Sequence, residues 1–137
     1  MELQFTVLGR PRGKGRPRFG NGRTYTDKQT LEYERLIATK ATEAMRYWPE
    51  GVVSTPVSVR IVVYKGIPAS WSKTRRQRAM MGGEIPGKPD LDNVAKAVLD
   101  ALNGVAYVDD VQVVKLAVSK HYSDEPRIEV SVREMLE

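Results

Sequence analysis

One segment, LDNVAKAVLDALNG at residues 91–104, has the spacing of an amphipathic helix that must cover another surface. Its apolar residues recur three and four positions apart, and Asn103 and Gly104 supply a helix stop. A helix with such a stripe gains most of its stability from packing. The stripe consists of Leu91, Val94, Ala95, Val98, Leu99 and Leu102. The segment therefore predicts a helix that is packed on a sheet or on another helix.

Period-two alternation predicts the sheet on which this helix packs. In VSVRIVVYK, every second residue from Val57 to Val63 is apolar, which is typical of a strand with one buried face. The last two strands flank the turn SDEP and are expected to pair as an antiparallel hairpin. The predicted strands are residues 2–8, 57–65, 111–122 and 127–135.

The remaining segments are expected to be helical or irregular. A long helix is predicted at residues 24–48, with Thr26 or Asp27 as its cap. One or two basic helical turns are predicted from Ser72 to Met80. The segment GRPRGKGRPRFGNGR before the long helix is rich in glycine and proline and predicts a loop.

The order of these elements is strand, long helix, strand, basic turn, helix, strand and strand. It predicts one α+β domain over residues 1–137, a small mixed or antiparallel β-sheet with two main helices packed on it. No internal repeat is present.

Composition excludes several kinds of chemistry. The chain has no cysteine and a single histidine, so thiolate catalysis, cysteine-ligated zinc and zinc held by several histidines are excluded. His121 lies just before a predicted turn and is interpreted as an ordinary exposed residue. No apolar run is long enough to span a membrane, and MELQFTVLGR lacks the layout of a secretory signal. We therefore expect a cytoplasmic protein whose chemistry uses carboxylates, lysine, arginine or hydroxyls.

The basic residues indicate a polyanionic partner. The formal net charge is +5, and five cations alternate with glycine and proline in the N-terminal loop: Arg10, Arg12, Lys14, Arg16 and Arg18. A solvated, flexible loop is one interpretation. Contact with a phosphate backbone is favoured because arginine suits phosphate oxygens and glycine permits close approach. A second cluster beside Trp71, formed by Lys73, Arg75, Arg76 and Arg78, supports a nucleic acid that is bound through its backbone.

The acidic residues of KPDLDN allow two interpretations. In the first, Asp90 caps the helix and Asp92 forms an ordinary helix pair with Lys96. In the second, both carboxylates meet the pair Asp109 and Asp110, because the start of the following strand is expected to approach the helix start. Such a cluster needs a cation to offset repulsion, and Mg²⁺ prefers carboxylate oxygens. A metal-dependent nuclease and a structural role for the acids both remain open on spacing alone.

The combination of KPDLDNVAKAVLDALNG, VDDVQVV and KHYSDEPRIEVSV resembles the RusA family of Holliday-junction resolvases. GRPRGKGRPR and ASWSKTRRQRAM are also similar to members of that family. The resemblance implies a RusA-like fold and a homodimeric crossover junction endodeoxyribonuclease. Such an enzyme depends on Mg²⁺, with Mn²⁺ as a substitute, and resolves branched four-way DNA junctions by paired symmetric nicks. It uses no small-molecule cofactor and no membrane.

The resemblance also implies roles for individual residues. The catalytic residues would be Asp90, Asp92, Asp110 and Lys96. The metal ligands would be Asp90, Asp92 and Asp110, with Asp109 as a secondary ligand or a turn residue. The DNA-binding residues would be Arg10, Arg12, Lys14, Arg16, Arg18, Lys88 and Asn93. Two alternatives remain beside this interpretation, a less selective flap or fork nuclease and a non-catalytic DNA-binding module.

Overall fold

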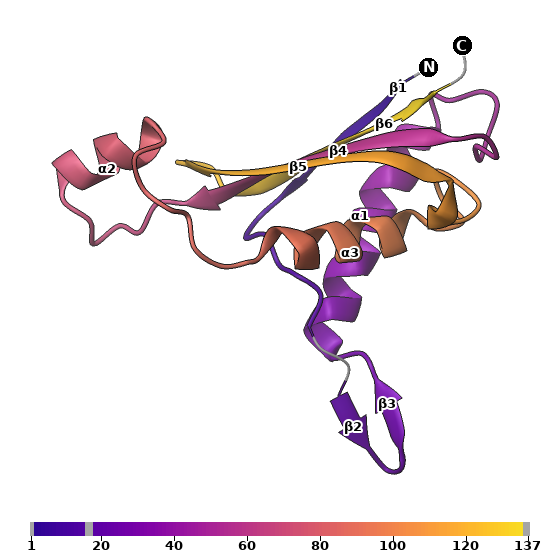
Figure 1. The fold of residues 1–137 in the computed structure, drawn as a ribbon, viewed down its shortest axis with the longest axis horizontal. Coiled ribbons are helices and arrows are strands. Elements are labelled where there is room, and N and C mark those ends of the chain that lie inside the picture. The colour runs from indigo at the N-terminus through magenta and orange to yellow at the C-terminus, as the bar shows by residue number, and fades with distance from the viewer. Residues whose placement is uncertain (1, 16–17, 136–137) are drawn as a thin grey trace.

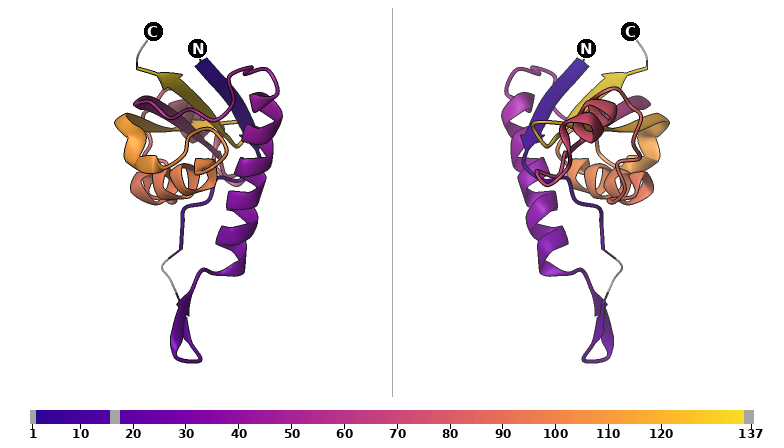
Figure 2. Two further views of the ribbon diagram at one scale, coloured as in Figure 1. Left: turned by 90° about the vertical axis from the view of Figure 1, so that its right-hand side faces the viewer. Right: turned by 90° about the vertical axis from the view of Figure 1, so that its left-hand side faces the viewer.

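Strand β4 (Val57–Gly66) is central to a four-stranded sheet of order β1–β6–β4–β5. The computed structural model describes residues 2–15 and 18–135. β1 (Glu2–Leu8) pairs antiparallel with β6 (Arg127–Glu134), which pairs antiparallel with β4, and β5 (Val113–Ser123) pairs with β4 in parallel. Helices α1 (Lys28–Met45) and α3 (Leu91–Leu102) cover one face of this sheet, as Figures 1 and 2 show. The predicted α+β architecture is confirmed.

The core lies between this helical layer and the inner row of β4. Val57, Val59, Ile61 and Val63 are fully buried, and the stripe of α3 is buried against the same core. The opposite face of the sheet is polar and open, and His121 is exposed there beside Tyr64. None of the helices in the described residues combines the length and the apolar character that crossing a membrane requires.

The two last strands do not form the expected hairpin. β5 and β6 each pair with β4, one on either side of it, and the turn after β5 carries the chain across the end of β4. β4 is buried along its inner row, and strands on both sides complete the ladder hydrogen bonds of this buried strand. The antiparallel pairing of β5 with β6 was therefore a wrong prediction.

A second correction concerns the N-terminal loop. Residues 18–25 contain a small hairpin, β2 (Arg18–Gly20) and β3 (Arg23–Tyr25), which projects from the body below α1 in Figure 1. Its turn is Asn21–Gly22, and both residues have positive φ angles, 50° and 75°. Asn-Gly is the strongest short hairpin signal because both residues tolerate this conformation.

Residues 9–15, which we call the strap, run between α1 and α3 rather than into solvent. The backbone N–H of Lys14 donates to the Asn93 carbonyl at 2.9 Å, and that of Gly15 donates to Thr30 Oγ1 at 3.1 Å. A β-carbon at Gly13 would lie 2.7 Å from Asn93 Cβ, and one at Gly15 would lie 2.4 Å from Asp27 Oδ2. These two glycines therefore serve close approach to the protein itself, whereas the sequence had suggested approach to a phosphate chain.

Side-chain caps set the starts of two helices, and the cap of α1 is one of the two residues that were predicted. Asp27 caps α1 by accepting from the Thr30 N–H at 2.9 Å. Ser72 caps α2 (Lys73–Met80) by accepting from the Arg75 N–H. α2 projects from the far end of the sheet, away from α1 (Figure 1).

The strap predicts a specific sensitivity to a single methyl group. Gly13→Ala should lower the free energy of unfolding by about 1–3 kcal/mol, because the new β-carbon overlaps a rigid neighbour on α3. Denaturant titration measures this change. Gly66→Ala is the matched control, since its β-carbon would meet Pro126 at an ordinary 3.6 Å. Equal effects of the two substitutions would show that the strap does not pack closely on α3.

Candidate active site

Asp90 and Asp92 lie at the start of α3, and the capping interpretation fails for the Asp90 carboxylate. Asp90 has the extended backbone of an N-cap, but its side chain makes no cap hydrogen bond. Its two oxygens instead accept from Lys88 Nζ at 3.1 and 3.2 Å. Asp92 and Lys96 are both exposed, and the described residues show no ion pair between them. Asp92 is therefore available to a ligand, and Asp90 becomes available when its exposed pair with Lys88 opens.

The second acidic pair lies at the opposite end of α3. Asp110 is close enough to Asp109 for their carboxyl groups to share a hydrogen bond, and this contact is the main cause that raises the pKa of Asp110. Burial and the nearby charge of Asp100, in the last turn of α3, raise the pKa further. Asp109 also caps the short helix η1 (Asp110–Gln112), in a box completed by Gln112. Asp109 thus occupies a turn position, and its part as a secondary metal ligand stays a prediction.

A short return of the chain places this pair at the helix end. Gly104 has a φ of 75° and donates to the Tyr107 carbonyl at 2.7 Å. The Tyr107 ring is fully buried, and its hydroxyl donates to the Leu99 carbonyl at 2.8 Å. The chain consequently enters β5 beside the end of α3, and only the far half of β5 returns to the helix start. Within a single chain, the start of β5 therefore does not approach the start of α3, and that prediction was wrong.

The aspartates therefore form two groups. Ten residues of helix separate Asp90 from Asp100, which corresponds to about 15 Å. Within the described part of the chain, no three acidic or histidine side chains are arranged to hold a metal ion. A single chain thus does not fit the three-carboxylate magnesium site, and the assignment of Asp90, Asp92, Asp109 and Asp110 as ligands stays a prediction.

Lys14 is held inside the protein. Its Nζ donates to Asp100 Oδ2 at 2.6 Å and to Glu34 Oε1 at 3.1 Å, so that it joins the strap to both main helices. The hydrogen bond to Asp100 is the main cause that raises the pKa of Lys14. Its predicted contact with DNA remains untested, but its charge is already matched by two carboxylates.

The other cations of the N-terminal segment differ in their surroundings. Arg12 donates to Gln29 at 3.2 Å, and Arg10 is exposed beside it. Arg16 lies outside the described residues, and for Arg18 only the strand is described. Asn93 accepts the backbone hydrogen bond of the strap. DNA contacts by these residues and by Lys88 stay predictions.

Comparison with known proteins places this chain. The family model described as endodeoxyribonuclease RusA matches residues 9–133. The chain belongs to the RusA endodeoxyribonuclease family. It is also 41% identical to the uncharacterized protein YqaN of Bacillus subtilis (strain 168), over 97% of this chain and 96% of that protein. The resemblance drawn from the sequence is confirmed, and family membership makes the chain a nuclease of the RusA type.

In this RusA-family chain, two carboxylates partly offset the four cations of the basic cluster on α2. Glu84 pairs with both Arg75 and Arg78 at 3.2 Å, and Arg76 pairs with Asp124 at 3.5 Å. Arg75 also lies over the Trp71 ring, 3.6 Å from its centroid. These pairs reduce the charge that the cluster can offer to nucleic acid, but they leave part of it unmatched.

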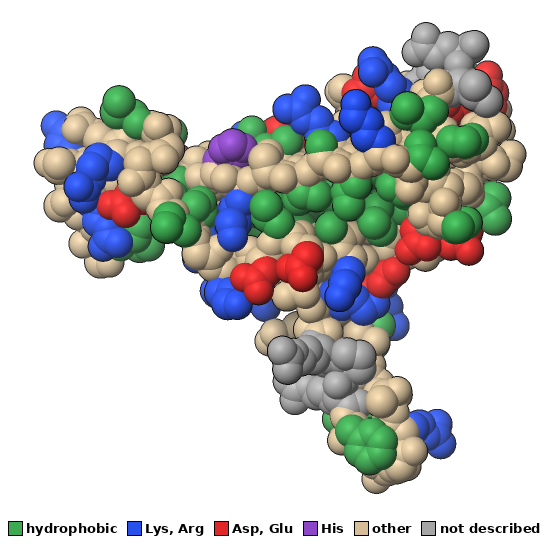
Figure 3. Space-filling model, in the orientation of Figure 1, with side chains coloured by type: hydrophobic (Ala, Val, Ile, Leu, Met, Phe, Trp, Pro, Cys, Tyr) green, Lys and Arg blue, Asp and Glu red, His purple; other side chains and the backbone are tan. Residues whose placement is uncertain are grey.

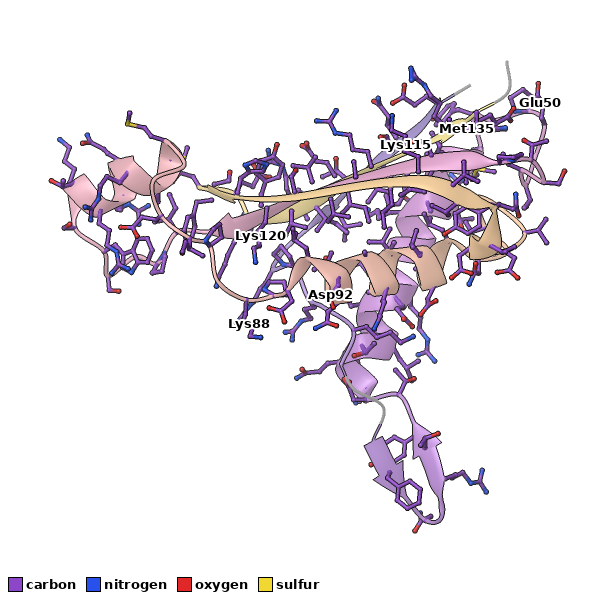
Figure 4. The ribbon with its side chains drawn as sticks, viewed as in Figure 1. Glu50, Lys88, Asp92, Lys115, Lys120 and Met135 are labelled. Carbon is purple, nitrogen blue, oxygen red and sulfur yellow. The ribbon has the colours of Figure 1, made fainter. Side chains whose placement is uncertain are left out.

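Two lysines near Asp90 and Asp92 of this RusA-family chain were not predicted from the sequence. Lys120 on β5 donates to the carbonyls of Gly87 and Pro89, in the loop that leads to Asp90. Lys65 continues the inner row of β4 after Val63. Lys65 could have been found from the sequence, because it continues the period-two row of buried apolar residues in β4. Figure 4 shows Lys88, Lys120 and Asp92 around the start of α3.

Removing the Lys14 bridge should destabilise the fold. Lys14→Met is expected to cost about 1 kcal/mol near neutral pH, a modest value because Asp100 is partly exposed. The raised pKa means that the contribution is fully present below about pH 10.4 and is lost as the pH rises through the folded-state pKa.

Thermal and denaturant melts at pH 7 and in the alkaline range measure this effect. Lys28→Met removes an exposed lysine whose pair with Glu32 spans 3.9 Å, and it should change stability by less than about 0.5 kcal/mol. A Lys14→Met cost that grew above pH 11 would contradict the role of the bridge.

Proposed function

We propose that this RusA-family nuclease is a Mg²⁺-dependent homodimer that resolves four-way DNA junctions by paired symmetric nicks. One observation carries the proposal: the Asp90 carboxylate occupies an N-cap position without capping, beside the exposed Asp92. The pair with Lys88 is exposed and adds little stability, so a structural role accounts poorly for this side chain, whereas a cation ligand must be reachable from solvent. Family membership supplies the DNA substrate.

A complete acidic site requires two chains under this proposal, because one chain holds its aspartates at the two ends of α3. In a two-fold dimer with antiparallel α3 helices, the start of each helix lies beside the end of the other. Asp90 and Asp92 of one chain would then meet Asp110 of the second chain. Each dimer would carry two such sites, which is the number that paired nicks require.

An exposed apolar band that begins beside Asp109 and Asp110 and follows the first half of β5 supports this dimer. Val108, Val111, Val114 and Leu116 are all exposed, and Val111 reaches 80%. Leu116 is in register with the buried Val59, so it faces the side of the sheet that α3 covers. Figure 3 shows hydrophobic side chains along the border of β5 and α3, with acidic side chains toward both ends. A contiguous band of this kind is typical of an interface.

The residues of the chain would divide the work as follows. Asp90, Asp92 and Asp110 would hold the metal, and Mn²⁺ should substitute for Mg²⁺. When bound, the metal supplies activation of water and charge stabilisation at the scissile phosphate. Lys96, one turn after Asp92, would offset charge on the reacting phosphate. The basic residues around the helix start would hold the incoming strands.

Asp92→Asn should abolish cleavage of a four-way junction and leave junction binding within about twofold, because it removes a carboxylate and keeps the basic surface. Strand-resolved products with Mg²⁺, with Mn²⁺ and with EDTA measure cleavage, and gel shifts in EDTA measure binding. Asp124→Asn is the control, since Asp124 is exposed at the turn after β5. Equal loss of binding and cleavage in Asp92→Asn would indicate a structural role.

Substrate choice tests the resolving activity itself. The wild-type protein should cut the junction symmetrically on two strands and should cut flaps and linear duplex much more slowly. Comparable rates on all three substrates would indicate a less selective nuclease instead.

Mixed dimers test the shared site. One chain carries Asp92→Asn and the other Asp110→Asn, with different affinity tags so that the heterodimer can be purified. In a shared arrangement both substitutions fall in one site and leave the second intact. We therefore expect single nicks from the heterodimer and no cleavage from either homodimeric variant. An inactive heterodimer would mean that each chain holds its own complete site.

A further inference from the structure

A basic hollow lies beside the start of α3, outside the acidic groups. Its volume is about 250 Å³, and its lining consists of two prolines, a glycine and four cations, Arg10, Arg12, Lys65 and Lys88. It is formed by the strap, the end of β4 and the loop before Asp90. These segments are far apart in the sequence, so the hollow is a product of the fold.

Lys65 is the innermost cation of this hollow. It is half-buried at the end of the inner row of β4. Burial, followed by the charges of Arg10 and Lys120, lowers the pKa of its ammonium group. Among the described residues, no carboxylate forms an ion pair with Lys65 or Arg10, whereas Lys88 pairs with Asp90. The fold therefore holds several like charges together without a matching anion.

The rim of the hollow is fixed in place. Lys120 ties the carbonyls of Gly87 and Pro89 to β5, and these residues flank Lys88. On the other side, Gly13 packs directly on Asn93 of α3. Like charges held at fixed positions destabilise a protein unless a ligand of opposite charge offsets them. The arrangement is thus suited to an anion that arrives from outside.

We propose that this hollow binds a phosphate group of the DNA backbone next to the phosphodiester at Asp90, with Lys65 as its innermost contact. Arginine and lysine donors on several sides suit the oxygens of a phosphate, and a nuclease of the RusA family meets such groups on every substrate. The inference rests on the proposed function and adds a positioning contact to it. An acidic protein segment is the competing occupant.

Salt-dependent binding tests the hollow without any cleavage. Lys65→Met and the wild type are titrated with a four-way DNA junction in EDTA at a series of salt concentrations. We expect the variant to bind about threefold to tenfold more weakly at 0.15 M salt, with a slope of log K against log salt that is smaller by about one. Lys65→Arg should retain the slope.

Lys115→Met is the matched control, because Lys115 lies in the first half of β5, away from the hollow, and is exposed (Figure 4). It should leave both affinity and slope nearly unchanged. Without DNA, Lys65→Met should raise the melting temperature, since it removes repulsion. Arg10→Met is expected to reduce the slope similarly, which keeps the proposal testable if Lys65→Met does not fold.

The outcomes separate this inference from the proposed function. If the wild type resolves junctions but Lys65→Met binds them like Lys115→Met, the phosphate site is wrong and the nuclease proposal stands. If the wild type binds but does not cleave, and Lys65→Met still loses one unit of slope, the nuclease proposal fails and the phosphate site stands. An unchanged DNA slope would also leave an acidic protein segment as the occupant.

Discussion

Burial of one stripe of α3 against the inner row of β4 determines where every acidic candidate lies. A straight helix that is packed along its length cannot bring its two ends together, so Asp90 and Asp92 stay apart from Asp100. The strap and the return through Tyr107 both form hydrogen bonds to this helix, at Asn93 and at Leu99. The position of the chemistry is thus a consequence of core packing, and the charged residues themselves do not set it.

The electrostatics of the single chain are consistent with this separation. Each end of α3 has a lysine for one of its carboxylates, Lys88 at the start and Lys14 at the end. The remaining strain lies between Asp109 and Asp110, where proximity raises the pKa of Asp110. If two chains bring the acidic ends together, repulsion grows and a divalent cation must offset it. Assembly and cation binding would then strengthen each other.

The sequence predicted the fold where the signal was local. Alternation located all four strands of the sheet, and the cap of α1 fell on Asp27 as expected. The Asn21–Gly22 pair is itself a hairpin signal. The many neighbouring glycines and prolines favoured an irregular loop, so the hairpin was not predicted. The place of Asp110 was not predictable, because it depends on a short return closed by Tyr107, and loop closure of this kind leaves no periodic pattern. Partner choice among strands likewise depends on the whole sheet.

The inner row of β5 changes from the apolar Leu116 and Val118 to the charged Lys120, which gives this strand two separate roles. A slip of one residue would turn Lys115 toward the apolar half and would withdraw Lys120 from the loop carbonyls. Because β5 is an edge strand, its register is fixed by pairing with β4 alone. An inserted residue inside β5 should therefore disrupt both the apolar band and the hydrogen bonds of Lys120 to the loop before Asp90. The same insertion in the preceding turn would leave both intact.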